Sequence, residues 1–158
     1  MTIKKTNAER ILEKEKIAYT PHTYDSTDGL IDGMAVAQKI GASPDRVFKT
    51  LVTVGASHEV SVFVLPVSKE LDLKKAAKEA GEKSLAMLPV KDIMKVTGYI
   101  RGGCSPIGMK KNYKTYFDAS ALNFETIILS AGAIGYQIEA AACDIAKVTG
   151  GVFASLTI

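Results

Sequence analysis

The segment that most constrains this chain is an apolar, β-branched run with one lysine at its centre, Arg46-Val47-Phe48-Lys49-Thr50-Leu51-Val52-Thr53-Val54. This composition is typical of an inner β-strand, in which successive side chains point to opposite faces. Lys49 therefore shares a face with Val47 and Leu51. If that face is covered, the ammonium needs an anionic or carbonyl partner, because an unpaired buried charge is costly. The alternative is an edge strand whose lysine reaches water along its stem.

Size and charge restrict the classes of protein that this chain can belong to. A chain of 158 residues with 47% hydrophobic residues predicts one compact domain over residues 1–158 with a full core. The 20 basic and 17 acidic residues leave a net charge of +3, which favours anionic partners only weakly. That balance excludes a dedicated, strongly basic nucleic-acid binder.

Nothing in the sequence indicates a membrane span, a leader or a metal centre. The most apolar run, residues 60–67, is interrupted by Ser61 and Pro66 and is far shorter than the roughly 20 residues of a membrane helix. Residues 1–6 lack the apolar core of a signal peptide, which predicts a cytoplasmic protein. Cys104 and Cys143 form no C-x-x-C pair. We therefore expect no zinc site, no disulfide framework and no cofactor.

Periodicity and turn residues predict helices mixed with strands, without a regular βαβ repeat. The strands at 46–54 and 60–67 are expected to form an antiparallel hairpin at the centre of a sheet. A turn is expected at Ala131-Gly132. We predict an α+β fold whose mixed, largely antiparallel sheet curls into a partial barrel with helices around it. The helices are expected at 7–16, 33–40, 72–81, 89–96 and 143–148, and the other strands at 18–24, 84–87, 115–117, 126–130, 137–140 and 152–155.

A glycine-rich loop from Gly98 to Gly108 is the second unusual feature. Its pair Gly102-Gly103 lets backbone N–H groups approach a ligand closely, and consecutive amides can bind an oxyanion or a phosphate. The alternative is an ordinary multi-turn connection, because glycine and proline mark loops of every function.

Cys104 lies in this loop and raises the question of a thiol nucleophile. Such a thiol needs a base or a low pKa, and neither histidine, His22 or His58, is near it in sequence. His58 is expected to be exposed in a hairpin turn, and His22 to lie in an edge strand. The Gly-x-Ser-x-Gly and Walker patterns are absent.

Four separated segments of the chain resemble the bacterial YbaK/EbsC proteins, which are free-standing Cys-tRNA(Pro) deacylases related to the editing domain inserted in prolyl-tRNA synthetase. The order and spacing of the segments agree over nearly the whole chain. The resemblance implies the mixed, barrel-like editing-domain fold. The segments are His22-Thr23-Tyr24, Val47-Phe48-Lys49-Thr50-Leu51, the helix from Leu71 to Ala77, and Gly98-Tyr99 through Gly102-Gly103-Cys104-Ser105-Pro106-Ile107-Gly108.

The same resemblance implies the site residues. The family's essential lysine corresponds to Lys49, and its substrate-facing tyrosine to Tyr24. Its remaining positions are the threonine after the lysine, the glycine-pair loop with its serine and proline, and the serine of a late strand: Thr50, Gly102, Gly103, Ser105, Pro106 and Ser130.

Three departures from the family bear on amino-acid selectivity. The chain has Leu30-Ile31-Asp32-Gly33 where the family often has an aromatic residue. It has Ser130-Ala131-Gly132 where Ser-Gly-Gly is frequent, and Gln137 where some members have aspartate.

The implied substrate is an aminoacyl ester at the 3′ end of tRNA, and the implied partner is prolyl-tRNA synthetase, with which the family associates transiently. Lys49 would hold the terminal phosphate or the ester oxygens, and the amides of Gly102 and Gly103 would stabilise charge on the carbonyl. In cysteinyl substrates, Cys-tRNA(Pro) or Cys-tRNA(Cys), the substrate's own thiol would attack the ester. Two alternatives stay open: editing of another residue such as alanine by water attack, and non-catalytic binding of a nucleotide or small anion.

Overall fold

The computed structural model describes residues 5–158, and Met1 to Lys4, which entered the argument against a leader, lie outside the described residues. The helices form where caps and amphipathic spacing coincide. Thr6 closes a capping box with Glu9, and Asp32 accepts a hydrogen bond of 3.0 Å from the Ala35 amide. The helices of the described residues are α1 (Asn7–Lys14), α2 (Gly33–Ile40), α3 (Leu73–Ala80), α4 (Val90–Thr97) and α5 (Ala142–Thr149), with a 3₁₀ turn, η1 (Ala119–Asn123).

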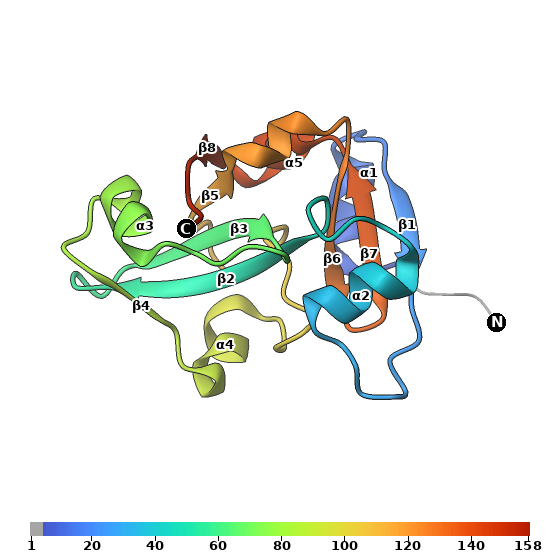
Figure 1. The fold of residues 1–158 in the computed structure, drawn as a ribbon, viewed down its shortest axis with the longest axis horizontal. Coiled ribbons are helices and arrows are strands. Elements are labelled where there is room, and N and C mark those ends of the chain that lie inside the picture. Colours follow the sequence, from blue (N-terminus) through green and yellow to red (C-terminus); the bar gives the residue numbers. More distant parts are fainter. Residues whose placement is uncertain (1–4) are drawn as a thin grey trace.

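The strands form two sheets. A three-stranded antiparallel sheet has the order β1-β7-β6, and a five-stranded sheet has the order β4-β2-β3-β5-β8. Figure 1 shows the smaller sheet beside α1 at one end of the molecule, and the long β2–β3 hairpin running toward the other. The strands are β1 (Thr20–Thr23), β2 (Phe48–Gly55), β3 (Val60–Pro66), β4 (Leu85–Met87), β5 (Lys114–Asp118), β6 (Ile127–Ala133), β7 (Tyr136–Ala140) and β8 (Val152–Ala154).

The predicted hairpin lies at the centre of the larger sheet. β2 and β3 are antiparallel, and Lys49 stands opposite Leu65. β5 and β8 then add in parallel on the far side of β3. The mixed α+β class is therefore confirmed. The partial barrel is not confirmed, because the strands pair into two sheets, with one parallel bridge between them at Val47 and Ile128.

The two faces of the β2–β3 hairpin are buried differently. One face contributes Phe48, Val62 and Val64 to the main core, which also takes in α1, α5 and the smaller sheet. The other face contributes Phe63 and Leu65 to a second core against α3. The two cores bury much of the hairpin, so a charged side chain on it is conspicuous.

The turn predicted at Ala131-Gly132 is wrong. β6 continues to Ala133, and the chain reverses at Ile134 and Gly135. The register of β6 against β7 shifts between Ser130 and Ala133, and Gly132 has a φ of +99° within this irregularity. The glycine thus serves a bulge inside the strand and not the hairpin turn.

Over residues 5–158, no helix has the length and apolar character needed to cross a membrane.

Candidate active site

Lys49 lies in the inner strand β2 without a partner for its charge among the described residues. Its ammonium forms no ion pair or hydrogen bond with any described residue. Burial lowers the pKa of Lys49 below its ordinary value, and the negative charge of Glu70 partly opposes that shift. A half-buried cation with no ion-pair or hydrogen-bond partner favours the binding of an anionic or carbonyl oxygen from a ligand.

Lys49 opens into a cavity of about 300 Å³. The cavity is enclosed by the start of α2, by β2, by the 101–104 loop, and by β6 and β7 of the smaller sheet. Segments distant in sequence thus meet here. The polar and loop residues of its wall are Asp32, Lys49, Thr50, Arg101, Gly102, Cys104, Ser130 and Gln137, and its apolar wall includes Ile31, Val36, Val47, Leu51 and Val67.

Two buried polar atoms on this wall lack hydrogen-bond partners, Thr50 Oγ1 and Gln137 Oε1. Gln137 is only 6% exposed and pairs across the sheet with Ser130, which also lines the cavity. Leaving a buried polar group unsatisfied costs about 1–3 kcal/mol, so such atoms are rare away from functional sites. These unsatisfied atoms therefore mark this wall as a candidate functional site.

The glycine loop places one residue with an unpaired amide, Gly102, on the cavity wall. Gly102 lines it with a φ of +87°, and its N–H donates to no described residue. The Gly103 N–H instead donates to the Ile100 carbonyl at 3.0 Å. A Cβ on Gly103 would meet the Ile134 nitrogen at 3.0 Å, so this glycine allows the loop to pack on the β6–β7 turn. Of the two amides predicted to bind a ligand, the Gly102 N–H is free and the Gly103 N–H already donates to Ile100.

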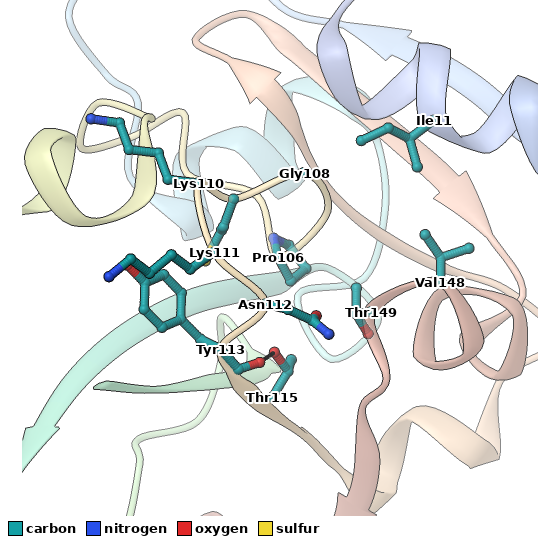
Figure 2. A pocket seen from close by; sticks show the side chains of 11 residues that line it. Ile11, Pro106, Gly108, Lys110, Lys111, Asn112, Tyr113, Thr115, Val148 and Thr149 are labelled. Atoms are coloured by element: carbon teal, nitrogen blue, oxygen red, sulfur yellow. Dashed lines mark hydrogen bonds between the residues drawn. The ribbon is translucent and has the colours of Figure 1, made fainter. Parts of the chain in front are cut away.

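Ser105 and Pro106 are not on the wall of this cavity. Ser105 is fully buried, and its Oγ accepts the Ile107 N–H at 3.2 Å, which holds the loop's own turn together. Pro106 lines a different cavity of about 270 Å³ between α1, the C-terminal end of α5 and residues 106–115. Figure 2 shows the ammonium groups of Lys110 and Lys111 turned away from Val148 and Thr149 there. Of the predicted site residues, this other cavity has only Pro106 on its wall.

Tyr24 is also not on the cavity wall. It follows β1, and its amide donates to the Gly135 carbonyl at 3.0 Å. Its hydroxyl is buried without a hydrogen-bond partner, and the Lys39 ammonium lies 5.8 Å from its ring centroid. The Lys39 ammonium also donates to Asp28 Oδ1 at 2.7 Å, which ties the loop before α2 to that helix. The role predicted for Tyr24 stays a prediction.

The environment of Cys104 disfavours a thiol nucleophile. Burial raises the pKa of this thiol to about 11, so the thiolate is scarce at neutral pH. His22 Nε2 lies 2.7 Å from Glu139 Oε1 at the β1–β7 pair, and His58 is exposed in the β2–β3 turn. Over residues 5–158, no group of three His, Cys, Asp or Glu side chains could hold a metal ion.

Arg101 is a cavity residue that no motif of the sequence predicted. It is exposed, precedes the glycine pair and has no ion-pair partner among the described residues. A lone arginine within a glycine-rich loop was the available signal. Ile31 was noted only as a departure, but its Cδ1 lies 2.8 Å from where a Cβ on Gly102 would be, so it packs directly on the glycine loop.

Comparison with known proteins identifies the family of this chain. The sequence model of the family described as "Aminoacyl-tRNA editing domain" matches residues 32–148. An Enterococcus faecalis protein, EbsC, named as a candidate Cys-tRNA(Pro)/Cys-tRNA(Cys) deacylase, is 46% identical over 156 residues, covering 99% of this chain and 95% of that protein. Proline–tRNA ligase of Shouchella clausii is 32% identical over 101 residues, which is 64% of this chain and 18% of the ligase.

The solved structures support the fold. A crystal structure described as a candidate trans-editing enzyme for prolyl-tRNA synthetase superposes with a TM-score of 0.83 at 21% identity, covering 99% of each chain. At that identity the match supports the fold alone. The resemblance to YbaK/EbsC proteins inferred from the sequence is confirmed. The chain belongs to the aminoacyl-tRNA editing domain family.

Proposed function

We propose that residues 1–158 act as one trans-editing unit that deacylates mischarged Cys-tRNA(Pro), and also Cys-tRNA(Cys). The observation that carries this proposal is the convergence, in one cavity, of the unpaired Lys49 ammonium, the free Gly102 amide and two unpartnered polar atoms. These groups suit a charged, ester-bearing substrate. The name of the Enterococcus faecalis relative adds the cysteinyl-tRNA substrate class.

Catalysis in this proposal needs no nucleophile from the protein. The cysteinyl thiol loses its proton and its sulfur attacks the ester carbonyl carbon. The bond from that carbon to the ribose oxygen then breaks, the oxygen gains a proton, and a cyclic thiolactone leaves free tRNA. Placing the thiol and the carbonyl in contact converts the attack into an intramolecular step, which is the main rate advantage available.

The cavity residues would stabilise the charge that develops in this step. Lys49 and the Gly102 amide would face the carbonyl oxygen as it becomes an oxyanion, in a site where burial strengthens electrostatics. Gln137 Oε1 would accept a hydrogen bond from the substrate's α-ammonium, and Thr50 Oγ1 and Ser130 Oγ would bind the ribose hydroxyl. The neutral amide at position 137 would orient the ammonium without a full counter-charge.

We further propose that tRNA selection comes from prolyl-tRNA synthetase as a transient partner in the cytoplasm. The shared region with the Shouchella clausii ligase makes an editing role beside that enzyme coherent. A pull-down with purified prolyl-tRNA synthetase, with and without tRNA(Pro), tests the partner separately from the reaction.

A substrate panel tests the reaction. We expect Cys-tRNA(Pro) to be deacylated, and Ala-tRNA(Pro) and Ser-tRNA(Pro) to be cleaved at least tenfold more slowly, because water would have to replace the thiol. Trapping the thiolactone identifies the route. Faster cleavage of Ala-tRNA(Pro) would establish the water-attack alternative. Binding without turnover of any of the three would establish the nucleotide-binding alternative.

Cys104→Ser separates the substrate thiol from the enzyme thiol. The variant should keep most of the activity, since the raised pKa of Cys104 leaves little thiolate to attack. Total loss of activity with an unchanged melting temperature would show that the protein supplies the nucleophile.

A further inference from the structure

A second cavity adjoins the Lys49 cavity, with a volume of about 240 Å³. The two cavities share part of their walls, so they are neighbours at the 101–104 loop. The shared residues are Thr50, Leu51, Arg101, Gly102 and Cys104.

The remaining wall of the second cavity is wholly apolar. It comes from β2, from β4 and the residue after it, and from α4, which Figure 1 shows below β2. Two of its side chains are well exposed, Met87 at 45% and Val90 at 56%. The residues of this wall are Val52, Met87, Leu88, Val90 and Ile93.

An aminoacyl-adenosine has the same division into a polar and an apolar part. Its ester, ammonium and ribose hydroxyl are polar, whereas its base is a flat ring with apolar faces. A cysteinyl side chain is one methylene and one thiol, far too small to fill the second cavity. A purine ring suits the apolar lining of this cavity, which is the lining expected of a small-molecule site. Met87 also offers a thioether, which makes favourable contacts with aromatic rings.

We propose that the second cavity binds the adenine of the terminal nucleotide while the aminoacyl ester lies beside Lys49. This inference rests on the proposed deacylase function. The ribose then spans the shared wall, at Thr50 and Gly102. Arg101 stands at that junction without an ion-pair partner among residues 5–158, and its planar guanidinium suits the 5′-phosphate of the same nucleotide.

The test compares cysteinylated acceptor minihelices whose terminal nucleotide either carries adenine or is abasic. The variant is Val90→Asn, and the matched control is Val152→Asn, because Val152 on β8 is also half-exposed, at 52%. For the unaltered protein, removing the base should raise KM roughly tenfold, the effect of a lost apolar contact in a pocket. Val90→Asn should raise KM similarly for the adenine substrate and add nothing for the abasic one.

Val152→Asn should behave as the unaltered protein with both substrates. Met87→Gln repeats the comparison at a second wall position, and Arg101→Gln should raise KM for both substrates alike. The proposal is overturned if the unaltered protein has the same KM for the abasic and the adenine substrates. It is also overturned if Val90→Asn raises KM for the abasic substrate by the same factor as for the adenine substrate, because the two changes would then act independently.

Binding of AMP and of ribose 5-phosphate, measured by calorimetry, distinguishes this inference from the deacylase proposal. AMP should bind more tightly than ribose 5-phosphate, and Val90→Asn should weaken the binding of AMP without changing the binding of ribose 5-phosphate. If no aminoacyl-tRNA is cleaved and AMP still shows this pattern, the deacylase function fails and the adenine site stands. Equal affinity for AMP and ribose 5-phosphate overturns the adenine site whatever the activity.

Discussion

Replacing Lys49 with methionine separates the catalytic value of its charge from the cost of burying it. Methionine has a similar length and no charge. Burial lowers the pKa of Lys49 from its ordinary 10.5, so the folded state binds this proton less tightly than the unfolded chain does. At neutral pH both states are protonated and the desolvation cost is fully present. That cost is relieved as the pH rises from the folded-state pKa toward 10.5.

Lys49→Met should change the folding stability and the deacylation rate in opposite directions. Because the side chain is only partly buried, solvent screening reduces the gain in folding free energy from Lys49→Met to on the order of 0.5 kcal/mol. Deacylation should fall by about 10²–10³, the usual loss on removing one group that stabilises an oxyanion. The variant should therefore be as stable as the unaltered protein, or slightly more so, and nearly inactive.

Single-turnover deacylation of Cys-tRNA(Pro) and urea unfolding at pH 7 and pH 10 measure the two quantities. Lys147→Met, at an exposed lysine on α5, is the control and should change neither. The stability difference between Lys49→Met and the unaltered protein should shrink at pH 10. Full activity in Lys49→Met would refute the role of the charge. A loss of more than about 1 kcal/mol in stability would show that the lysine is structural.

Three further predictions follow from the same geometry. Gly102→Ala should lower the stability by about 1–2 kcal/mol through its φ of +87°, and it should also impair deacylation, because the new methyl group meets Ile31 at 2.8 Å. The control Gly81→Ala, with a φ of +70° and open space around it, should lower the melting temperature through the same strain and keep full activity. Iodoacetamide at pH 7.5 should alkylate the exposed Cys143 at least tenfold faster than Cys104, whose thiol pKa is about 11. Equal alkylation rates, measured by mass spectrometry, would contradict the burial of the Cys104 thiol. Hydrogen bonds from Thr126 and His22 and the charge of Arg46 lower the pKa of Glu139 below 4.5, so the stability that ionised Glu139 contributes is present above pH 4.5 and is lost as the pH falls through the lower folded-state pKa. Glu139→Gln should therefore reduce the fall of the melting temperature at acidic pH, and an unchanged fall would show that Glu139 does not contribute to it.

The local elements of this fold were predictable because their causes are local. A capping box at Thr6 and Glu9 and the left-handed glycines Gly41 and Gly81 set helix ends through contacts within a few residues. The alternation around Lys49 likewise required only a strand. The misplaced turn at Ala131-Gly132 has the complementary cause: a glycine in a bulge and a glycine in a turn look the same until the partner strand sets the register.

The features of the candidate site separate in the same way into local ones and ones that depend on distant contacts. Sequence alone determined that a lysine would interrupt an apolar strand and that a diglycine loop would exist, because both are properties of short segments. Only the tertiary structure decided that Ser130 and Gln137 of the smaller sheet line the same cavity as Lys49. It also decided that the Gly103 amide donates to the Ile100 carbonyl while the Gly102 amide is free. Those outcomes depend on strand pairing and loop packing between residues far apart in the chain, and no periodicity within a segment encodes which distant group will meet it.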